Sequence, residues 1–347
     1  NNTDNGDTCN PTCNFTNQTE LFVGRPGETG YLDGSAEDAL LSGWGSLTVV
    51  DDFLFFGDSA NHVLRVIDIQ SGTIFTVAGN GEQRVADHTG QNASFHTLES
   101  LTTDGVNVWV ADLRCIRLVS AWSPFRVLTI IGDPDRRGCE DGLGDDATFT
   151  DIRGLVYYNK HIWLLDSECA TLRRFSPSTG DVVTLAGHAW AANEQRYIAD
   201  GVGAEASFVS PRYMTSDGAG ILYISDTNGA SIRAFDTRTN EVSTVAGNGV
   251  AQYLDGIGTD ARIARPRGLT FDGTSLYFLE FNNHTIRQIV LSDRSVSTMI
   301  GGHNEPDYLE GTGTSARIDS PYDIVYHYQS HSLFFFDSGN AVIRRIR

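Results

Sequence analysis

Lysine is nearly absent from this sequence. Lys160 is the one lysine among 347 residues, and the other 24 of the 25 basic residues are arginines. Asp and Glu total 44, so the formal net charge is −19 and the pI is near 4.7. The chain contains no basic run, which excludes a broad nucleic-acid-binding face and argues against adhesion to anionic lipid. No apolar run approaches the ~20 residues of a membrane span, so we expect no insertion into a membrane.

Proline is also scarce, at 9 residues, whereas glycine is abundant at 36. No stretch has the 3.6-residue apolar period of an amphipathic helix, which excludes helix-pair repeats. Short apolar runs between Gly, Asp and Asn residues are typical of β-strands joined by tight turns. The composition therefore favours an all-β protein.

Cysteine is limited to Cys9, Cys13, Cys115, Cys139 and Cys169. This odd number allows at most two internal disulfides and leaves one thiol. Asn-x-Ser/Thr triplets begin at Asn1, Asn14, Asn17, Asn92 and Asn283. Together these features favour an exported protein, whether extracellular, at the cell surface or periplasmic. The polar opening residues cannot bury themselves, so residues 1–18 are predicted to be a flexible tail.

A pattern of about 55 residues recurs six times. An apolar residue followed by glycine marks each repeat, at Gly24, Gly79, Gly132, Gly187, Gly247 and Gly301. An acid-Gly pair follows most of these glycines, beginning at Asp33, Asp141, Asp200, Asp255 and Glu310, with Asp87-His88 in its place in the second repeat. An acid ends an apolar run in every repeat, at Asp58, Asp112, Asp166, Asp226, Glu280 and Asp337. An arginine follows five to seven residues later, at Arg65, Arg117, Arg173, Arg233, Arg287 and Arg344.

Each repeat contains four strand-like runs. In the fifth repeat they are Gly268–Phe271, Ser275–Glu280, Thr285–Val290 and Val296–Ile300. Four antiparallel strands repeated six times predict a six-bladed β-propeller over residues 19–347. The last repeat stops after its third strand, and residues 20–24 match the missing fourth strand. We therefore expect the N-terminal strand to complete the last blade and close the ring, because an open ring would leave an unpaired edge.

These markers resemble those of the NHL-repeat propellers. The stretches that match the Asn-His-Leu triplet of that family begin at Asn61 and Asn283, and each runs to an aliphatic-Arg pair. The loops at 200–206 and 255–261 also match the family pattern Asp-Gly-x-Gly-x-x-Ala. The second and third repeats depart from it, with Cys115 and Cys169 near the Asn position. The resemblance implies the fold; members of the family include protein or RNA platforms, extracellular sensor domains and a few enzymes.

One position at the start of each first strand should face the mouth of the central channel. In repeat order the residues there are Gly45, Glu99, Arg153, Arg212, Arg267 and Tyr322. Three consecutive blades thus place three arginines side by side in an acidic protein. Guanidinium forks match carboxylate, phosphate and sulfate oxygens, so the trio, bordered by Glu99 and Tyr322, is a candidate anion site. The alternative is that the arginines pair with Glu99, Asp151 or backbone carbonyls.

The recurring acid and arginine are interpreted as a structural clamp within each blade, with a ring of six functional sites as the alternative. On this interpretation Asp226→Ala or Arg233→Ala lowers the melting temperature without selectively changing ligand binding. The Asp-Gly loops are interpreted as turns, in which glycine supplies a positive φ and Asp accepts from neighbouring amides. Calcium is the rival interpretation, but the ligand spacing of an EF-hand is absent.

The remaining candidate residues are expected on the loop face, which is the face that carries the connections between blades and the loops between the second and third strands. Cys139 lies between the second and third repeats, and Cys115 and Cys169 flank it, so we expect a disulfide from Cys139 to one of them, with Cys115 favoured. Cys9 and Cys13 pair locally or remain unpaired in the tail. The longest repeat carries an insertion over 188–197. Partner-binding aromatic residues are expected at Trp190 and Tyr197 of this insertion, and at Trp44; the alternative is an insertion that packs its own tryptophan.

The sequence favours a non-catalytic, exported and monomeric binding module, whose loop face and channel mouth recognise a protein or a small anionic ligand. Its nine histidines do not recur at one repeat position, and no nucleophile elbow, Walker loop or HExxH motif is present. No metal site and no cofactor are therefore predicted. The alternatives are a lyase or hydrolase with zinc or calcium in the channel, and a structural module of a larger surface protein.

Overall fold

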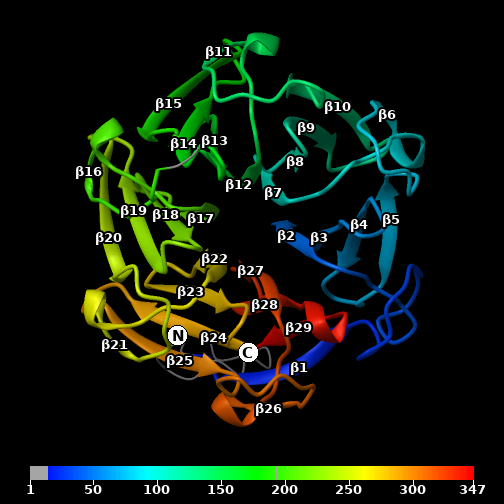
Figure 1. Cartoon of the computed structure of the whole chain (residues 1–347). Helices are drawn as coiled ribbons and strands as arrows, with labels where there is room; N and C mark the ends of the chain where they lie inside the picture. The colour runs from blue at the N-terminus through cyan, green and yellow to red at the C-terminus, as the bar shows by residue number, and fades with distance from the viewer. Residues whose placement is uncertain (1–14, 192–193) are drawn as a thin grey trace, which may run out of the picture.

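The computed structural model describes residues 15–191 and 194–347. Six antiparallel sheets surround a central axis like the blades of a propeller (Figure 1). From the axis outward, blade 1 contains β2 (Gly45–Val50), β3 (Phe53–Asp58), β4 (Val63–Asp68) and β5 (Ile74–Ala78), and blade 2 contains β7 (Ser100–Thr103), β8 (Asn107–Asp112), β9 (Cys115–Ser120) and β10 (Arg126–Gly132). In the same order, blade 3 contains β12 (Ile152–Tyr158), β13 (His161–Asp166), β14 (Thr171–Phe175) and β15 (Asp181–Gly187), and blade 4 contains β17 (Pro211–Ser216), β18 (Ile221–Asp226), β19 (Ser231–Asp236) and β20 (Glu241–Gly247). Blade 5 contains β22 (Pro266–Phe271), β23 (Ser275–Glu280), β24 (Thr285–Val290) and β25 (Ser295–Ile300), and blade 6 contains β27 (Pro321–His327), β28 (Ser332–Asp337), β29 (Val342–Ile346) and β1 (Gln18–Val23). The all-β, six-bladed prediction is confirmed.

A short fifth strand lies on the outer edge of every blade except the first. These strands are β6 (His88–Thr89), β11 (Gly142–Leu143), β16 (Gly201–Val202), β21 (Gly256–Ile257) and β26 (Gly311–Thr312). Each is followed by a one-turn 3-10 helix: η1 (Gly90–Asn92), η2 (Gly144–Asp146), η3 (Gly203–Glu205), η4 (Gly258–Asp260) and η5 (Gly313–Ser315). A sixth, η6 (Ser338–Asn340), lies between β28 and β29. The chain leading into a blade thus crosses the outer edge of that same blade before entering its innermost strand.

The two ends of the described chain close the ring. β1 pairs antiparallel with β29, with Thr19 opposite Ile346 and Leu21 opposite Arg344. In Figure 1 the blue β1 lies beside the red β29. The N-terminal strand therefore supplies the fourth strand of blade 6, as predicted. Residues 1–14, which contain Cys9 and Cys13, lie outside the described residues.

The hydrophobic core lies between neighbouring blades. Apolar side chains from facing sheets form clusters. Phe95 and Leu98 lie in the cluster between blades 1 and 2, and Phe149 lies in the cluster between blades 2 and 3. Burial of these faces removes apolar area from water and fixes the six blades against one another. Among the described residues, no helix is both long and apolar enough to cross a membrane.

The recurring arginine is fully buried in every blade. It forms an ion pair with the acid that ends the second strand in five blades: Arg65–Asp58 at 3.1 Å, Arg117–Asp112 at 2.6 Å, Arg173–Asp166 at 4.0 Å, Arg287–Glu280 at 3.2 Å and Arg344–Asp337 at 3.1 Å. In blade 4, Asp226 instead accepts from the backbone amides of Val209, Ser210 and Gly229. The predicted clamp is therefore present in five blades and absent as a direct pair in the fourth.

The Asp-Gly loops differ from the local turns that were predicted. In blade 5, Asp255 accepts from Arg287 NH2 at 2.9 Å and from the backbone amide and hydroxyl of Thr298 on β25. The equivalent acids in blades 1 to 4 make the same two kinds of contact. These carboxylates therefore fasten a loop to strands 30 or more residues away, and they do not accept from the amides of a local turn.

The predicted positive φ of the glycine after the acid is present in two loops, at +150° in Gly34 and +157° in Gly201. Gly142, Gly256 and Gly311, directly after the acid, are needed for close approach, because a Cβ there would lie 3.0–3.1 Å from the amide nitrogen of an alanine in the same loop. A glycine with a φ of +52° to +60° begins each of the five 3-10 helices that follow these loops.

Candidate functional site

The channel wall is built by the innermost strands of the six blades. In blades 1, 2 and 6 the residue after the mouth position bonds to a neighbouring blade: Ser46 Oγ accepts from Leu101 N at 3.0 Å, and Ser100 Oγ accepts from Leu155 N at 3.0 Å. Asp323 closes the ring by accepting from Leu47 N at 2.9 Å and from Ser46 Oγ at 2.8 Å. Side chains and backbone of all six innermost strands enclose a narrow cavity of about 120 Å³.

Arg153 is paired with two acids at the mouth. Its Nε donates to both carboxylate oxygens of Asp151, at 2.7 and 2.9 Å, and its NH1 donates to Glu99 Oε2 at 2.6 Å. Burial raises the pKa of the Glu99 carboxyl, and the charges of Arg153 and Arg212 oppose that rise. The expected pairing of the arginine trio with Glu99 and Asp151 therefore holds for Arg153.

Within the described residues, neither Arg212 nor Arg267 forms an ion pair with an acid. Arg212 donates through Nε to Ser210 Oγ at 3.3 Å, and within the described residues its terminal nitrogens have no hydrogen-bond or ion-pair partner. The guanidinium of Arg267 lies 3.8 Å from the ring centroid of Phe281 and 4.5 Å from that of Tyr322, and within the same residues it makes no ion pair. These cation–π contacts with two nearly perpendicular rings hold the guanidinium in place and leave its N–H groups available.

The predicted mouth residues are electrostatically coupled. Burial raises the pKa of Tyr322; the charge of Glu99 raises it further, and those of Arg267 and Arg153 lower it. Tyr213, the neighbour of Arg212, packs edge-on against Tyr322 with ring centroids 6.1 Å apart. The structure thus brings Glu99, Arg153, Arg212, Arg267 and Tyr322 together at one end of the channel.

Sequence reasoning missed three residues of this region. Phe281 forms one side of the arginine stack, Tyr213 packs against Tyr322, and Asp323 closes the channel ring. Tyr213 and Asp323 occupy the position directly after the mouth residue, so aligning one more column of the repeat would have found them. Phe281 directly follows the clamp acid Glu280, and no repeat marker points to it.

Asp323 gives the fold a measurable dependence on pH. Burial raises the pKa of its carboxyl from 3.8 to about 6, because hydrogen bonds alone oppose the desolvation. A folded-state pKa above the unfolded value contributes stability that is complete below pH 3.8 and is lost as the pH rises through about 6. Over that range the contribution of Asp323 to the free energy of unfolding should fall by roughly 3 kcal/mol.

This dependence predicts that Asp323→Asn becomes more stable relative to the wild type as the pH rises from about 4 to about 8. Urea unfolding across that range measures the difference. The matched control is Asp236→Asn, whose carboxyl has a pKa lowered to about 2 by hydrogen bonds from Arg238, so its titration lies below the range tested. Parallel curves for the wild type and Asp323→Asn would contradict the assignment.

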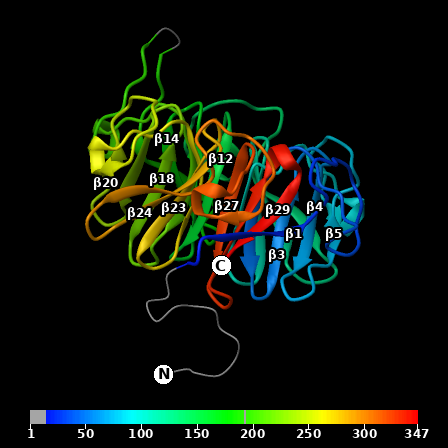
Figure 2. The ribbon, with the colours of Figure 1, turned by 90° about the horizontal axis from the view of Figure 1, so that it is seen from below.

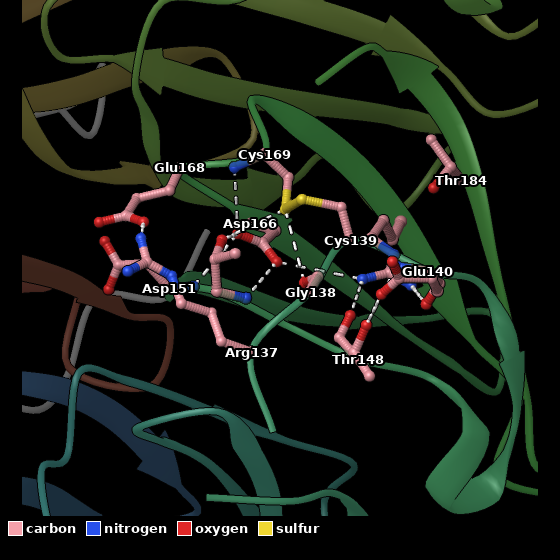
Figure 3. Close-up of a disulfide and its surroundings, with 12 residues drawn as sticks. Arg137, Gly138, Cys139, Glu140, Thr148, Asp151, Asp166, Glu168, Cys169 and Thr184 are labelled. Atoms are coloured by element: carbon pink, nitrogen blue, oxygen red, sulfur yellow. Dashed lines mark hydrogen bonds and ion pairs between the residues drawn. A yellow bond between two sulfur atoms is a disulfide. The ribbon is translucent and has the colours of Figure 1, made fainter. Parts of the chain in front are cut away.

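A disulfide joins the loop that enters blade 3 to the β13–β14 turn of the same blade. Cys139 and Cys169 are bonded, and an ion pair between Arg137 and Glu168 runs beside the bridge (Figure 3). The bridge from Cys139 was predicted, but the favoured partner was wrong. Cys115 is buried as a free thiol at the start of β9, and burial raises its pKa to about 12. The loop crosses blade 3 before it enters that blade, which brings Cys139 to Cys169.

The bridge also lies next to the mouth. Cys169 N donates to Asp166 Oδ1 at 3.3 Å, and the same carboxylate accepts from the amides of Thr150 and Asp151 at 2.9 and 3.2 Å. Asp151 is the residue that binds Arg153 Nε. In Figure 3, Asp166 lies between the bridge and Asp151. The disulfide therefore supports the turn that presents one of the two acids of the mouth.

The insertion between blades 3 and 4 projects from one face of the disc (Figure 2). Trp190 is half-buried and donates to Phe208 O at 2.9 Å, so it packs against blade 4. Tyr197 contacts Trp190 and is 57% exposed, and Trp44 is 45% exposed. The alternative of a self-packed tryptophan thus describes Trp190, while Tyr197 and Trp44 have the exposure that a partner contact needs. Their role stays a prediction.

Fold and channel together define a class of protein: a six-bladed repeat propeller with a polar channel and an arginine-rich mouth. No protein-family model matches the chain. It is 28% identical to Protein SUPPRESSOR OF QUENCHING 1, chloroplastic, of Arabidopsis thaliana over 285 residues, which cover 78% of this chain and 27% of that protein. It is 25% identical to NHL repeat-containing protein 2 of Bos taurus over 329 residues, which cover 85% of this chain and 45% of that protein.

Among solved structures, the chain is similar to an auxiliary nutrient binding protein from Bacteroides ovatus, with a TM-score of 0.73 and 16% identity over 96% of this chain and 77% of the other. At this identity the likeness shows the fold alone. The chain spans less than half the length of the curated relatives named above. The repeats and the closed ring make it a six-bladed β-propeller, and over most of its length the chain is similar to NHL repeat-containing proteins.

Proposed function

We propose that this propeller is an exported, non-catalytic binding module whose channel mouth takes up an anionic group of its ligand. One observation carries the proposal: among the residues that the structure describes, Arg212 and Arg267 at the mouth form no ion pair, in a chain of net charge −19. A guanidinium that stays unpaired among so many acids is available to a ligand anion.

Two further observations support the proposal. The disulfide is typical of proteins that mature in an oxidising compartment. The Bacteroides ovatus protein of similar fold is described as an auxiliary nutrient binding protein, and a small-molecule ligand at the channel mouth fits that kind of role. A protein partner on the loop face, near Tyr197 and Trp44, is a second form of the same binding function.

The test is calorimetric titration of the wild-type protein with acetate, phosphate and sulfate, followed by the double variant Arg212→Ala/Arg267→Ala. We expect the wild type to bind at least one anion and the double variant to lose at least tenfold in affinity. Arg84→Ala is the control, because Arg84 is 60% exposed and pairs with an exposed Glu82 far from the channel. Anion binding that persists in the double variant would discard the site.

The alternative of a lyase or hydrolase requires a metal in the channel. Within residues 15–191 and 194–347, no group of three His, Cys, Asp or Glu side chains is arranged to hold one. Elemental analysis of the purified protein decides between the two functions. About one equivalent of zinc or calcium would replace the binding proposal by metal-assisted chemistry.

A further inference from the structure

The mouth contains two kinds of polar group, and they lie on different blades. Blades 4 and 5 supply Arg212 and Arg267, which form no ion pair within the described part of the chain, whereas blades 2 and 3 supply Glu99, Asp151 and the arginine between them. We infer that the ligand is a carboxylated sugar, whose carboxylate binds the two free arginines and whose hydroxyl groups bind the two acids. This inference rests on the proposed function, because it names the class of ligand for the same site.

The geometry of Arg267 favours a planar carboxylate. The guanidinium carbon of Arg267 lies 3.8 Å from the ring centroid of Phe281 and 4.5 Å from that of Tyr322, and the two rings are nearly perpendicular to each other. The rings hold the guanidinium in place, and its N–H groups remain to bind an acceptor. The edge of a guanidinium presents parallel N–H groups, which a carboxylate accepts in a bidentate manner. Arg212 on the neighbouring blade has its terminal nitrogens free to contact the same group.

The charges at the mouth favour a single negative charge on the ligand. Arg153, Arg212 and Arg267 supply three positive charges, while Glu99 and Asp151 supply two negative ones. Asp323, one residue further along β27, is directed to blade 1, where Ser46 and Leu47 donate to it. A carboxylate balances the remaining positive charge, whereas a phosphate dianion would add a second charge beside two acids.

The two acids are suited to neutral hydroxyl donors. Arg153 already neutralises part of their charge through contacts of 2.6 to 2.9 Å, so an ammonium group is not required. A carboxylate has about four lone-pair sites, and those left over can accept from O–H groups. Burial raises the pKa of Tyr322 above 10.0, so its hydroxyl keeps its proton and can donate.

The cavity below the mouth continues this pattern. It is narrow, with a volume of about 120 Å³. Hydroxyl side chains line it, among them Thr48, Thr102, Thr215 and Thr270. A sugar ring therefore sits across the mouth and does not pass into the channel, and its inward hydroxyls meet a hydroxyl-lined, hydrated wall.

The experiment is calorimetric titration of the intact protein with D-galacturonate, D-glucuronate, D-galactose, acetate and phosphate. We expect at least one uronate to bind tenfold or more tightly than acetate and than the neutral sugar. Arg267→Lys keeps the charge but removes the planar fork, and should weaken uronate binding about tenfold. Glu99→Gln should reduce the advantage of uronate over acetate while acetate binding is retained. Arg84→Ala should behave as the wild type.

The outcomes separate this inference from the proposed function. If acetate or phosphate binds as tightly as the uronates, the site is an anion site and the sugar inference is wrong. If no anion binds, the inference and the proposed function both fail. If uronates bind but Arg267→Lys and Glu99→Gln leave their affinities unchanged in folded protein, as judged by circular dichroism, the ligand binds elsewhere and the inference is overturned.

Discussion

Replacing Arg287 by methionine is expected to lower the free energy of unfolding by about 3–5 kcal/mol, which is a large part of the stability of an ordinary domain. Arg287 is fully buried and donates to Glu280 and to the carbonyl of Arg262 through NH1. Its NH2 donates to Asp255 and to the carbonyl of Leu254. Methionine fills much of the volume but leaves the carboxylate of Glu280 buried without its cation.

Chemical denaturation of Arg287→Met and of the wild type measures this loss. Arg238→Met is the control, because its ion pair with Asp236 is on the surface and its side chain is 74% exposed, so the expected change is below about 1 kcal/mol. Adding Glu280→Gln to Arg287→Met should recover part of the stability, since the uncompensated charge is then removed. Equal effects of Arg287→Met and Arg238→Met would show that the clamp does not stabilise the blade.

The repeat spacing predicted the features of the fold that are set within a single blade. Gly24, Gly79 and the equivalent glycines gave the number of blades, and the truncated sixth repeat gave the closure by β1. The four strands of blade 5 begin within two residues of the predicted positions and end at them. These features follow from local turn and strand patterns, which repeat in every blade.

Contacts between segments far apart in sequence were harder to predict. Asp255 and Arg287 are 32 residues apart and meet because the loop entering a blade folds over the outer edge of that blade. The same path brings Cys139 to Cys169 and not to Cys115. The repeat alignment identified which residues lie at the mouth. It could not predict the contact between Arg267 and Phe281, because that contact depends on the directions of the side chains.

Removal of the disulfide by Cys139→Ser/Cys169→Ser is expected to lower the free energy of unfolding by roughly 3–4 kcal/mol. The bridge closes a segment of 30 residues, and the loss of its constraint on the unfolded chain is worth about that much at room temperature. Denaturation with and without dithiothreitol measures the effect. Reductant should destabilise the wild type to the level of the double variant and leave the double variant unchanged.

Cys115→Ala provides the control for this measurement. Its side chain is buried as a free thiol, so the variant keeps the bridge and should respond to reductant as the wild type does. Because Cys169 shares the carboxylate of Asp166 with Thr150 and Asp151, the double variant should also loosen Asp151 and with it the position of Arg153. We therefore expect anion affinity at the mouth to fall in the double variant under conditions where it is still folded. If thiol labelling shows that the bridge is reduced and the wild type keeps its stability, the stability prediction is wrong. An unchanged anion affinity in the folded double variant would contradict the second part.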